Sequence, residues 1–107
     1  MAWATLCELD ELKEGEGKSV EIDGHRLAVF LHEGRVSVID DRCPHAGASL
    51  SAGWIDRGCA VCPLHAWAFD LRDGKLQGTG AVGVDVYASR AIDHDGKKLI
   101  QADVPMP

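Results

Sequence analysis

Short runs of apolar residues, separated by glycine-containing turns, recur along most of the chain. Runs of this length that are apolar throughout, or that alternate apolar with polar residues, are typical of β-strands. An acidic residue followed by glycine favours a hairpin turn, because glycine adopts a positive φ without steric cost. We expect strands over 19–22, 27–31, 36–39, 84–87 and 98–101, with 27–31 central, and turns at Asp23-Gly24, Glu33-Gly34, Asp73-Gly74 and Asp95-Gly96. This pattern predicts an all-β fold, an antiparallel sandwich or barrel.

Three segments depart from the strand pattern. Residues 7–12 are the one helical candidate, and because they are few and lie among acidic residues we expect a solvated turn. Residues 43 to about 80 are rich in Gly, Ala, Ser and Pro and poor in strand-like runs. A segment of this kind in a small domain is usually functional. The last residues, 104–107, are expected to fray.

Length and charge narrow the class of protein. The 107 residues suffice for a single domain, 1–107. No apolar run approaches the ~18 residues of a membrane span, and the N-terminus has no basic start or apolar stretch of a signal peptide. We therefore expect a cytoplasmic protein with no membrane partner. The net charge of −6 argues against nucleic-acid binding and suits a partner with a basic patch, although it also keeps a small domain soluble.

Two of the four cysteines lie next to histidines in the unusual middle segment. The pairs are Cys43-Pro44-His45 and Cys62-Pro63-Leu64-His65, and sixteen residues separate them. Each pair offers one thiolate and one imidazole on a short, proline-containing turn. This combination favours metal chemistry over disulfides.

Three interpretations of these pairs compete. A mononuclear zinc site accepts two Cys and two His, but zinc modules usually place Cys with Cys and His with His. A redox-active Cys59-Ala60-Val61-Cys62 motif normally lies at the N-terminus of a helix, and no such helix is predicted. A [2Fe–2S] cluster with two Cys on one iron and two His on the other explains why each turn mixes the two ligand types.

The longer motifs resemble those of the Rieske family. They read Cys-Pro-His-Ala-Gly-Ala-Ser-Leu at 43–50 and Cys-Pro-Leu-His-Ala-Trp-Ala-Phe-Asp-Leu at 62–71. Ligand types, spacing and the neighbouring Pro and Gly agree together, which makes the motif specific. The resemblance implies an antiparallel β fold with two cluster-binding loops at one tip, within a segment of about 43–74.

The resemblance also implies the cofactor and its ligands. It assigns Cys43 and Cys62 to one iron of a [2Fe–2S] cluster, and His45 and His65 to the other. With all four positions taken by protein ligands, no open coordination site remains. No Ser-His-Asp set, phosphate-binding glycine loop or dinucleotide fingerprint is present either. We expect this chain alone to carry single electrons and not to catalyse a reaction.

Departures from the high-potential relatives predict a low redox potential. The positions of their loop-linking disulfide are Ala48 and Leu64, and the positions of two hydroxyl side chains are Trp67 and Phe69. Hydroxyl groups that donate to cluster sulfur or a ligand thiolate stabilise the reduced state, so their loss lowers the potential. We expect a value below about 0 mV, in a family range of roughly −150 to +300 mV.

Two physiological roles remain open. The chain resembles the small subunit of NAD(P)H-dependent assimilatory nitrite reductase, a resemblance that includes Trp67, and also the ferredoxins that link a flavin reductase to an aromatic-ring dioxygenase. Either role implies redox protein partners, a reductase as donor and a terminal oxidoreductase as acceptor. A zinc-stabilised structural module is a minor alternative.

Residues outside the motif receive structural interpretations. Cys7 and Cys59 are expected to be small buried residues. The remaining histidines lie near strand ends or turns and are expected at the surface: His25, His32 and His94. Trp54 is expected in the core. Trp67 is expected beside the cluster, where it either shields the cluster from water or packs against its neighbours.

Overall fold

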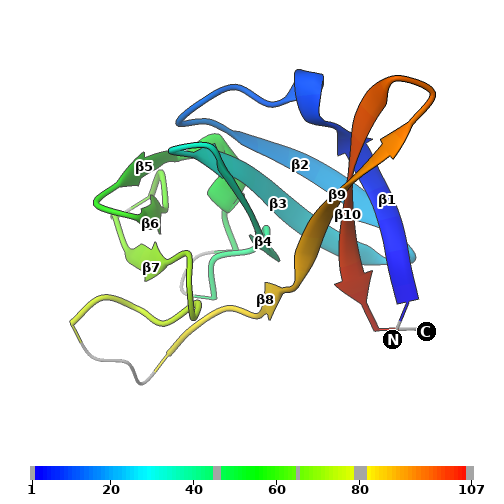
Figure 1. Cartoon of the computed structure of the whole chain (residues 1–107). Coiled ribbons are helices and arrows are strands. Elements are labelled where there is room, and N and C mark those ends of the chain that lie inside the picture. Colours follow the sequence, from blue (N-terminus) through cyan, green and yellow to red (C-terminus); the bar gives the residue numbers. More distant parts are fainter. Residues whose placement is uncertain (1, 45–46, 65, 79–81, 106–107) are drawn as a thin grey trace.

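The computed structural model describes residues 2–44, 47–64, 66–78 and 82–105, which form three antiparallel sheets. The central sheet has the order β2-β3-β4-β8, and smaller sheets of order β1-β10-β9 and β5-β6-β7 flank it (Figure 1). The strands are β1 (Ala2–Glu8), β2 (Gly17–Ile22), β3 (His25–His32), β4 (Arg35–Asp40), β5 (Trp54–Asp56), β6 (Cys59–Val61), β7 (Ala68–Asp70), β8 (Val86–Tyr87), β9 (Ser89–His94) and β10 (Lys97–Val104). The all-β prediction is confirmed. In the part of the chain described, no helix is long and apolar enough to cross a membrane.

Three of the four predicted acid–glycine turns are two-residue hairpin turns. In each, both residues have positive φ, as at Asp23 (48°) and Gly24 (81°), which matches the twist of the joined strands. The chain also turns at Asp73-Gly74, but over more residues: Phe69 pairs with Leu76 in an antiparallel bridge, the Asp70 amide donates to the Lys75 carbonyl, and only the glycine has positive φ. A Cβ at Gly74 would lie 2.0 Å from the Val84 carbonyl oxygen, so this glycine permits a close backbone approach.

Strand β3 is central, as the sequence predicts, and is buried on both faces. It pairs with β2 on one side and β4 on the other. Since side chains alternate along a strand, Leu27 and Val29 face one apolar layer, whereas Ala28 and Phe30 face the other. Both layers therefore depend on this one strand.

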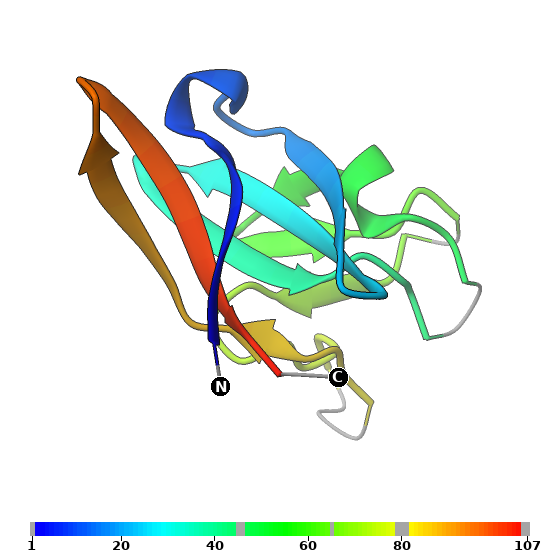
Figure 2. The same ribbon diagram turned by 90° about the vertical axis from the view of Figure 1, so that its right-hand side faces the viewer.

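Figure 2 shows how the smaller sheets are arranged around the central sheet, and an apolar layer covers each of its two faces. Cys7, Ile100, Ala102 and Val104 bring β1 and β10 onto one face. On the other face lies a second cluster of Ala28, Phe30, Ile39, Cys43, Leu50, Ala60, Cys62, Phe69 and Leu71. This second cluster contains both cysteines of the predicted site.

Several local expectations need correction. Residues 7–12 do not act as one turn, because Cys7 belongs to β1, and only η1 (Leu9–Glu11) is a short 3-10 turn. Val104 does not fray; it pairs with Ala2 and is buried, while 106–107 lie outside the described residues. Strands β1 and β9 were not predicted, and neither were β5, β6 and β7 in the segment expected to be poor in strands.

Candidate metal centre

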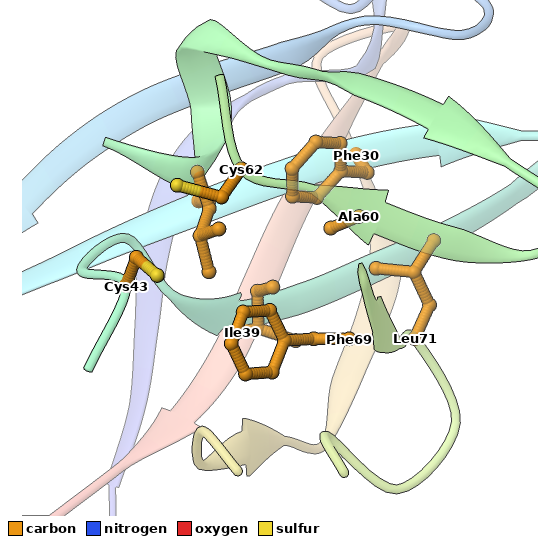
Figure 3. Close-up of a cluster of buried hydrophobic side chains, with 9 residues drawn as sticks. Phe30, Ile39, Cys43, Ala60, Cys62, Phe69 and Leu71 are labelled. Atoms are coloured by element: carbon orange, nitrogen blue, oxygen red, sulfur yellow. The ribbon is translucent and has the colours of Figure 1, made fainter. Parts of the chain in front are cut away.

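Cys43 and Cys62 lie at the start of two different loops. Cys43 follows β4 and Cys62 follows β6, and both are fully buried. Figure 3 shows their sulfur atoms at the same end of the apolar cluster between the central sheet and the β5-β6-β7 sheet. The fold therefore brings together two thiols that are 19 positions apart in the chain.

Backbone hydrogen bonds close the loop after Cys43. The amide of Cys43 donates to the Ala48 carbonyl at 2.9 Å, and the amide of Gly47 donates to the Cys43 carbonyl at 2.7 Å. Gly47 has a φ of 69°, a left-handed conformation that glycine adopts without strain. The thiol at Cys43 is thus held by a loop whose backbone is tied across its base.

The loop after Cys62 is closed in a similar way. The Cys62 amide donates to the Trp67 carbonyl at 2.8 Å, and the backbone N–H of Leu64 donates to the Cys62 sulfur. On the other side, a Cβ at Gly53 would lie 1.8 Å from the Val61 carbonyl oxygen and 3.2 Å from Pro63. Gly53 therefore lets the chain before β5 pack tightly against the start of this loop.

The two buried thiols interact with each other. Burial raises the pKa of the Cys62 thiol, the N–H of Leu64 opposes that rise, and the adjacent Cys43 adds to it. Two thiolates this close in an apolar layer repel each other and lack water to solvate them. A cation bound between them removes both costs, so the pair suits a metal ion.

A buried carboxylate anchors the chain that enters the first loop. Asp41 is fully buried and accepts hydrogen bonds from Ser19 Oγ (2.8 Å), Ser49 Oγ (3.2 Å) and the Ser51 amide (2.7 Å). Arg26 lies 3.8 Å away. This network fixes both ends of the loop to the central sheet. Sequence reasoning missed Asp41, since nothing in the strand pattern marks it as buried.

The remaining predicted site residues fall into two groups. His45 and His65 lie outside the described residues. Cys59 is buried, as expected, and its thiol donates to Gln77 Oε1 at 3.6 Å. Among the described residues no three potential metal donors gather, so Cys59 does not join Cys43 and Cys62 in a metal-binding group.

The sequence predicts a position for each of the two tryptophans near the loops. Trp67 is half-buried and packs against the cluster of apolar residues that contains the two thiols, next to the fully buried Phe69. The prediction for Trp54 is wrong: it is 48% exposed, because the alternation of β5 turns Ile55 inward instead. Cys7 is buried and His94 is exposed, as expected, whereas His25 and His32, at the two ends of β3, are only half-buried.

Two adjacent buried thiols on neighbouring loops of an antiparallel β fold are typical of a protein that binds a metal ion or an iron–sulfur cluster. The thiols, their N–H donor and the apolar surroundings fit an iron–sulfur cluster, which is bound by thiolates and tuned by such hydrogen bonds. The model of the Rieske [2Fe–2S] domain matches residues 2–88. The chain belongs to this family and has a [2Fe–2S] cluster as its cofactor.

Individual relatives include electron-transfer subunits of two kinds. The chain is 38% identical over 76 residues to the 3-phenylpropionate/cinnamic acid dioxygenase ferredoxin subunit of Photorhabdus laumondii, covering 70% of this chain and 71% of the relative. A solved structure described as an NADH-dependent nitrite reductase small subunit from Mycobacterium tuberculosis has a TM-score of 0.84 at 31% identity, covering 98% of this chain and 97% of that one. Other relatives are much longer: 68% of this chain matches cholesterol 7-desaturase of Ciona intestinalis, 40% identical over 75 residues, but this is 16% of that protein. The chain is a Rieske-type electron carrier.

Proposed function

We propose that this chain is a one-electron carrier that accepts electrons from a reductase and passes them to a terminal oxidoreductase. Residues 1–107 form a single domain in which Cys43 and Cys62 bind one iron, and His45 and His65 bind the other. The observation that carries the proposal is the contact between two fully buried thiols from separate loops. A cytoplasmic location fits this role.

The residues of the chain hold the centre and control its surroundings. When bound, the cluster supplies a redox centre that gains or loses one electron. The Leu64 N–H places a partial positive charge against the Cys62 sulfur. Phe69 is fully buried in the apolar cluster that contains both thiols, and the half-buried Trp67 packs against this cluster, so both side chains help to keep water out of it.

The proposed potential is low, below about 0 mV within the family range. Hydroxyl donors to sulfur raise the potential because they stabilise the reduced, more negative state. The two positions at which high-potential relatives carry hydroxyls hold Trp67 and Phe69 here. Phe69 is fully buried, so no donor enters from that position.

The role as nitrite reductase small subunit is favoured by the likeness to the M. tuberculosis structure along almost the whole of both chains. The second candidate, a dioxygenase ferredoxin, is favoured by the likeness to the P. laumondii subunit. For either, the net charge of −6 suits a partner with a basic surface. Stable copurification with a large sirohaem subunit indicates the first role, whereas a free monomer that reduces an oxygenase indicates the second.

An EPR-monitored redox titration of anaerobically purified protein tests the proposal, with iron and sulfide counted on the same sample. We expect two irons and two sulfides per chain, and a Rieske-type signal that appears below about 0 mV. A potential near the upper end of the range contradicts the hydrogen-bond argument. Zinc in place of iron contradicts electron transfer altogether.

Two variants test the ligand assignment in the same experiment. His45→Ala and His65→Ala each remove one iron ligand, so we expect both to lose the mixed-ligand cluster and its visible absorption. His94→Ala, at the exposed end of β9, is the matched control and retains both. Unchanged iron content in either ligand variant refutes the assignment.

A further inference from the structure

Two tryptophans are strongly exposed, and they differ in what covers them. Trp3 on β1 is 41% exposed, and the guanidinium of Arg90 lies 4.1 Å above its ring. That arrangement is a cation–π contact, which stabilises an exposed indole. Trp54 on β5 is 48% exposed, and among the described residues no such cation covers it.

Trp54 lies beside the second loop of the metal centre. Strand β5 pairs with β6, with Trp54 opposite Val61, the residue before Cys62. Gly53, which precedes Trp54, packs against Pro63. Trp54 therefore sits next to the chain segment that carries one of the two buried thiols.

The surroundings of Trp54 are apolar on one side and charged on the other. Pro63 is exposed, and Leu64 is 49% exposed. Asp56 is exposed and, two residues along β5, faces the same side as Trp54. The segment 62–69 contains no Asp, Glu, Lys or Arg.

We propose that Trp54, Pro63, Leu64 and Asp56 form the surface on which the redox partner docks, with Trp54 as its anchor. The partner presents an apolar patch bordered by basic groups. Trp is one of the side chains that are enriched among the residues that dominate binding energy at protein interfaces. Asp56 and the net charge of −6 supply the complementary charge.

The inference rests on the proposed function, because it assumes that electrons leave through a protein contact near the cluster. Its test uses the reduced holoprotein and two oxidants of the same charge sign. Cytochrome c is a protein with a basic surface, whereas hexaammineruthenium(III) is a small cation with no apolar surface. In each reaction one electron passes from the reduced cluster to the ferric haem or to ruthenium(III), and no proton or bond changes.

We expect Trp54→Ala to slow the reduction of cytochrome c by about tenfold, the effect of losing an anchor residue, with Trp54→Phe intermediate. The rate with hexaammineruthenium(III) and the midpoint potential stay unchanged, which excludes damage to the cluster. Trp3→Ala, the matched control, leaves both rates unchanged. Asp56→Asn weakens the dependence of the cytochrome c rate on salt.

Two outcomes overturn the inference, and they are distinguishable. Equal cytochrome c rates for the wild type and Trp54→Ala refute the anchor while leaving the electron carrier intact. If Trp54→Ala slows both oxidants equally, or shifts the potential, Trp54 acts on the cluster and not on docking. Absence of electron transfer to either oxidant from the wild-type protein refutes the proposed function itself.

Discussion

Replacing Asp41 by Ala removes the anchor of the first loop. The carboxylate accepts two short hydrogen bonds, from Ser51 N–H at 2.7 Å and Ser19 Oγ at 2.8 Å, and a longer one from Ser49 Oγ at 3.2 Å. A hydrogen bond to a charged group contributes about 1.5–3 kcal/mol. The serines are partly exposed, so water replaces part of what they lose. Taking the low end for the two short bonds gives a loss of about 3 kcal/mol.

That loss is large but leaves a folded protein. Domains of this size have a free energy of unfolding of about 5–15 kcal/mol. Since 1 kcal/mol shifts the melting temperature of a domain near this size by about 4–8 °C, we expect a decrease of at least about 12 °C. The loop that carries Cys43 loses its fixed base, so the cluster is expected to dissociate at a lower temperature than in the wild type.

The assay is anaerobic thermal melting of the holoprotein, followed by far-UV circular dichroism and by the visible absorption of the cluster. Asp41→Asn retains an acceptor for Ser51 and is expected to fall between Asp41→Ala and the wild type. Asp10→Asn, at an exposed position where the side chain accepts no hydrogen bond among the described residues, controls for the change in charge. The expected decrease for Asp41→Ala is at least about 12 °C. A melting temperature within about 3 °C of the Asp10→Asn value therefore refutes the argument that the hydrogen bonds of Asp41 stabilise the protein.

Three further changes have definite expected outcomes. Cys59→Ser leaves iron content and potential nearly intact, because its thiol bonds Gln77 and not the other thiols; loss of the cluster on iron analysis contradicts this. Gly53→Ala lowers the free energy of unfolding by at least about 3 kcal/mol, the upper end of the usual cost of overpacking, because the new Cβ would lie 1.8 Å from the Val61 carbonyl oxygen. A melting temperature equal to that of the wild type contradicts this prediction. Hydrogen bonds from Arg72 lower the pKa of the Asp70 carboxyl in the folded protein. The pair therefore stabilises the fold at pH values above the pKa that Asp70 has in the unfolded chain, and this stabilisation is lost as the pH falls through the pKa of Asp70 in the folded protein. Arg72→Gln should therefore move the acid-unfolding midpoint, followed by circular dichroism, to higher pH, and an unmoved midpoint counts against the pair.

The sequence predicts the central part of the fold well, because hairpin turns and strands there are local features. Both residues of the Asp23-Gly24 turn, for example, have the positive φ that a two-residue turn requires. Strand β1 is harder to predict, since it forms by pairing with β10 at the far end of the chain. The register between such distant segments is not encoded in either one alone.

The site shows the same division between local and long-range information. The ligand motif is a local pattern, and the fold brings Cys43 and Cys62 together as that pattern implies. Two other features depend on neighbours that are distant in sequence. Asp41 is buried because Ser19, 22 residues earlier, completes its hydrogen bonds. Trp54 is exposed because the pairing of β5 with β6 turns Ile55 toward the core, which residue type alone does not reveal.

The pairing of β1 with β10 has a consequence for how this domain can be connected to other proteins. Ala2 lies directly opposite Val104, so the two ends of the fold are about 5 Å apart. A domain with adjacent ends can be inserted into a surface loop of a host protein without stretching it. The same geometry permits circular permutation: a short linker joins the ends, and the chain reopens at the exposed turn of Asp95 and Gly96. Such a permutant places new termini at the β9–β10 turn while leaving the order of residues through both loops unchanged.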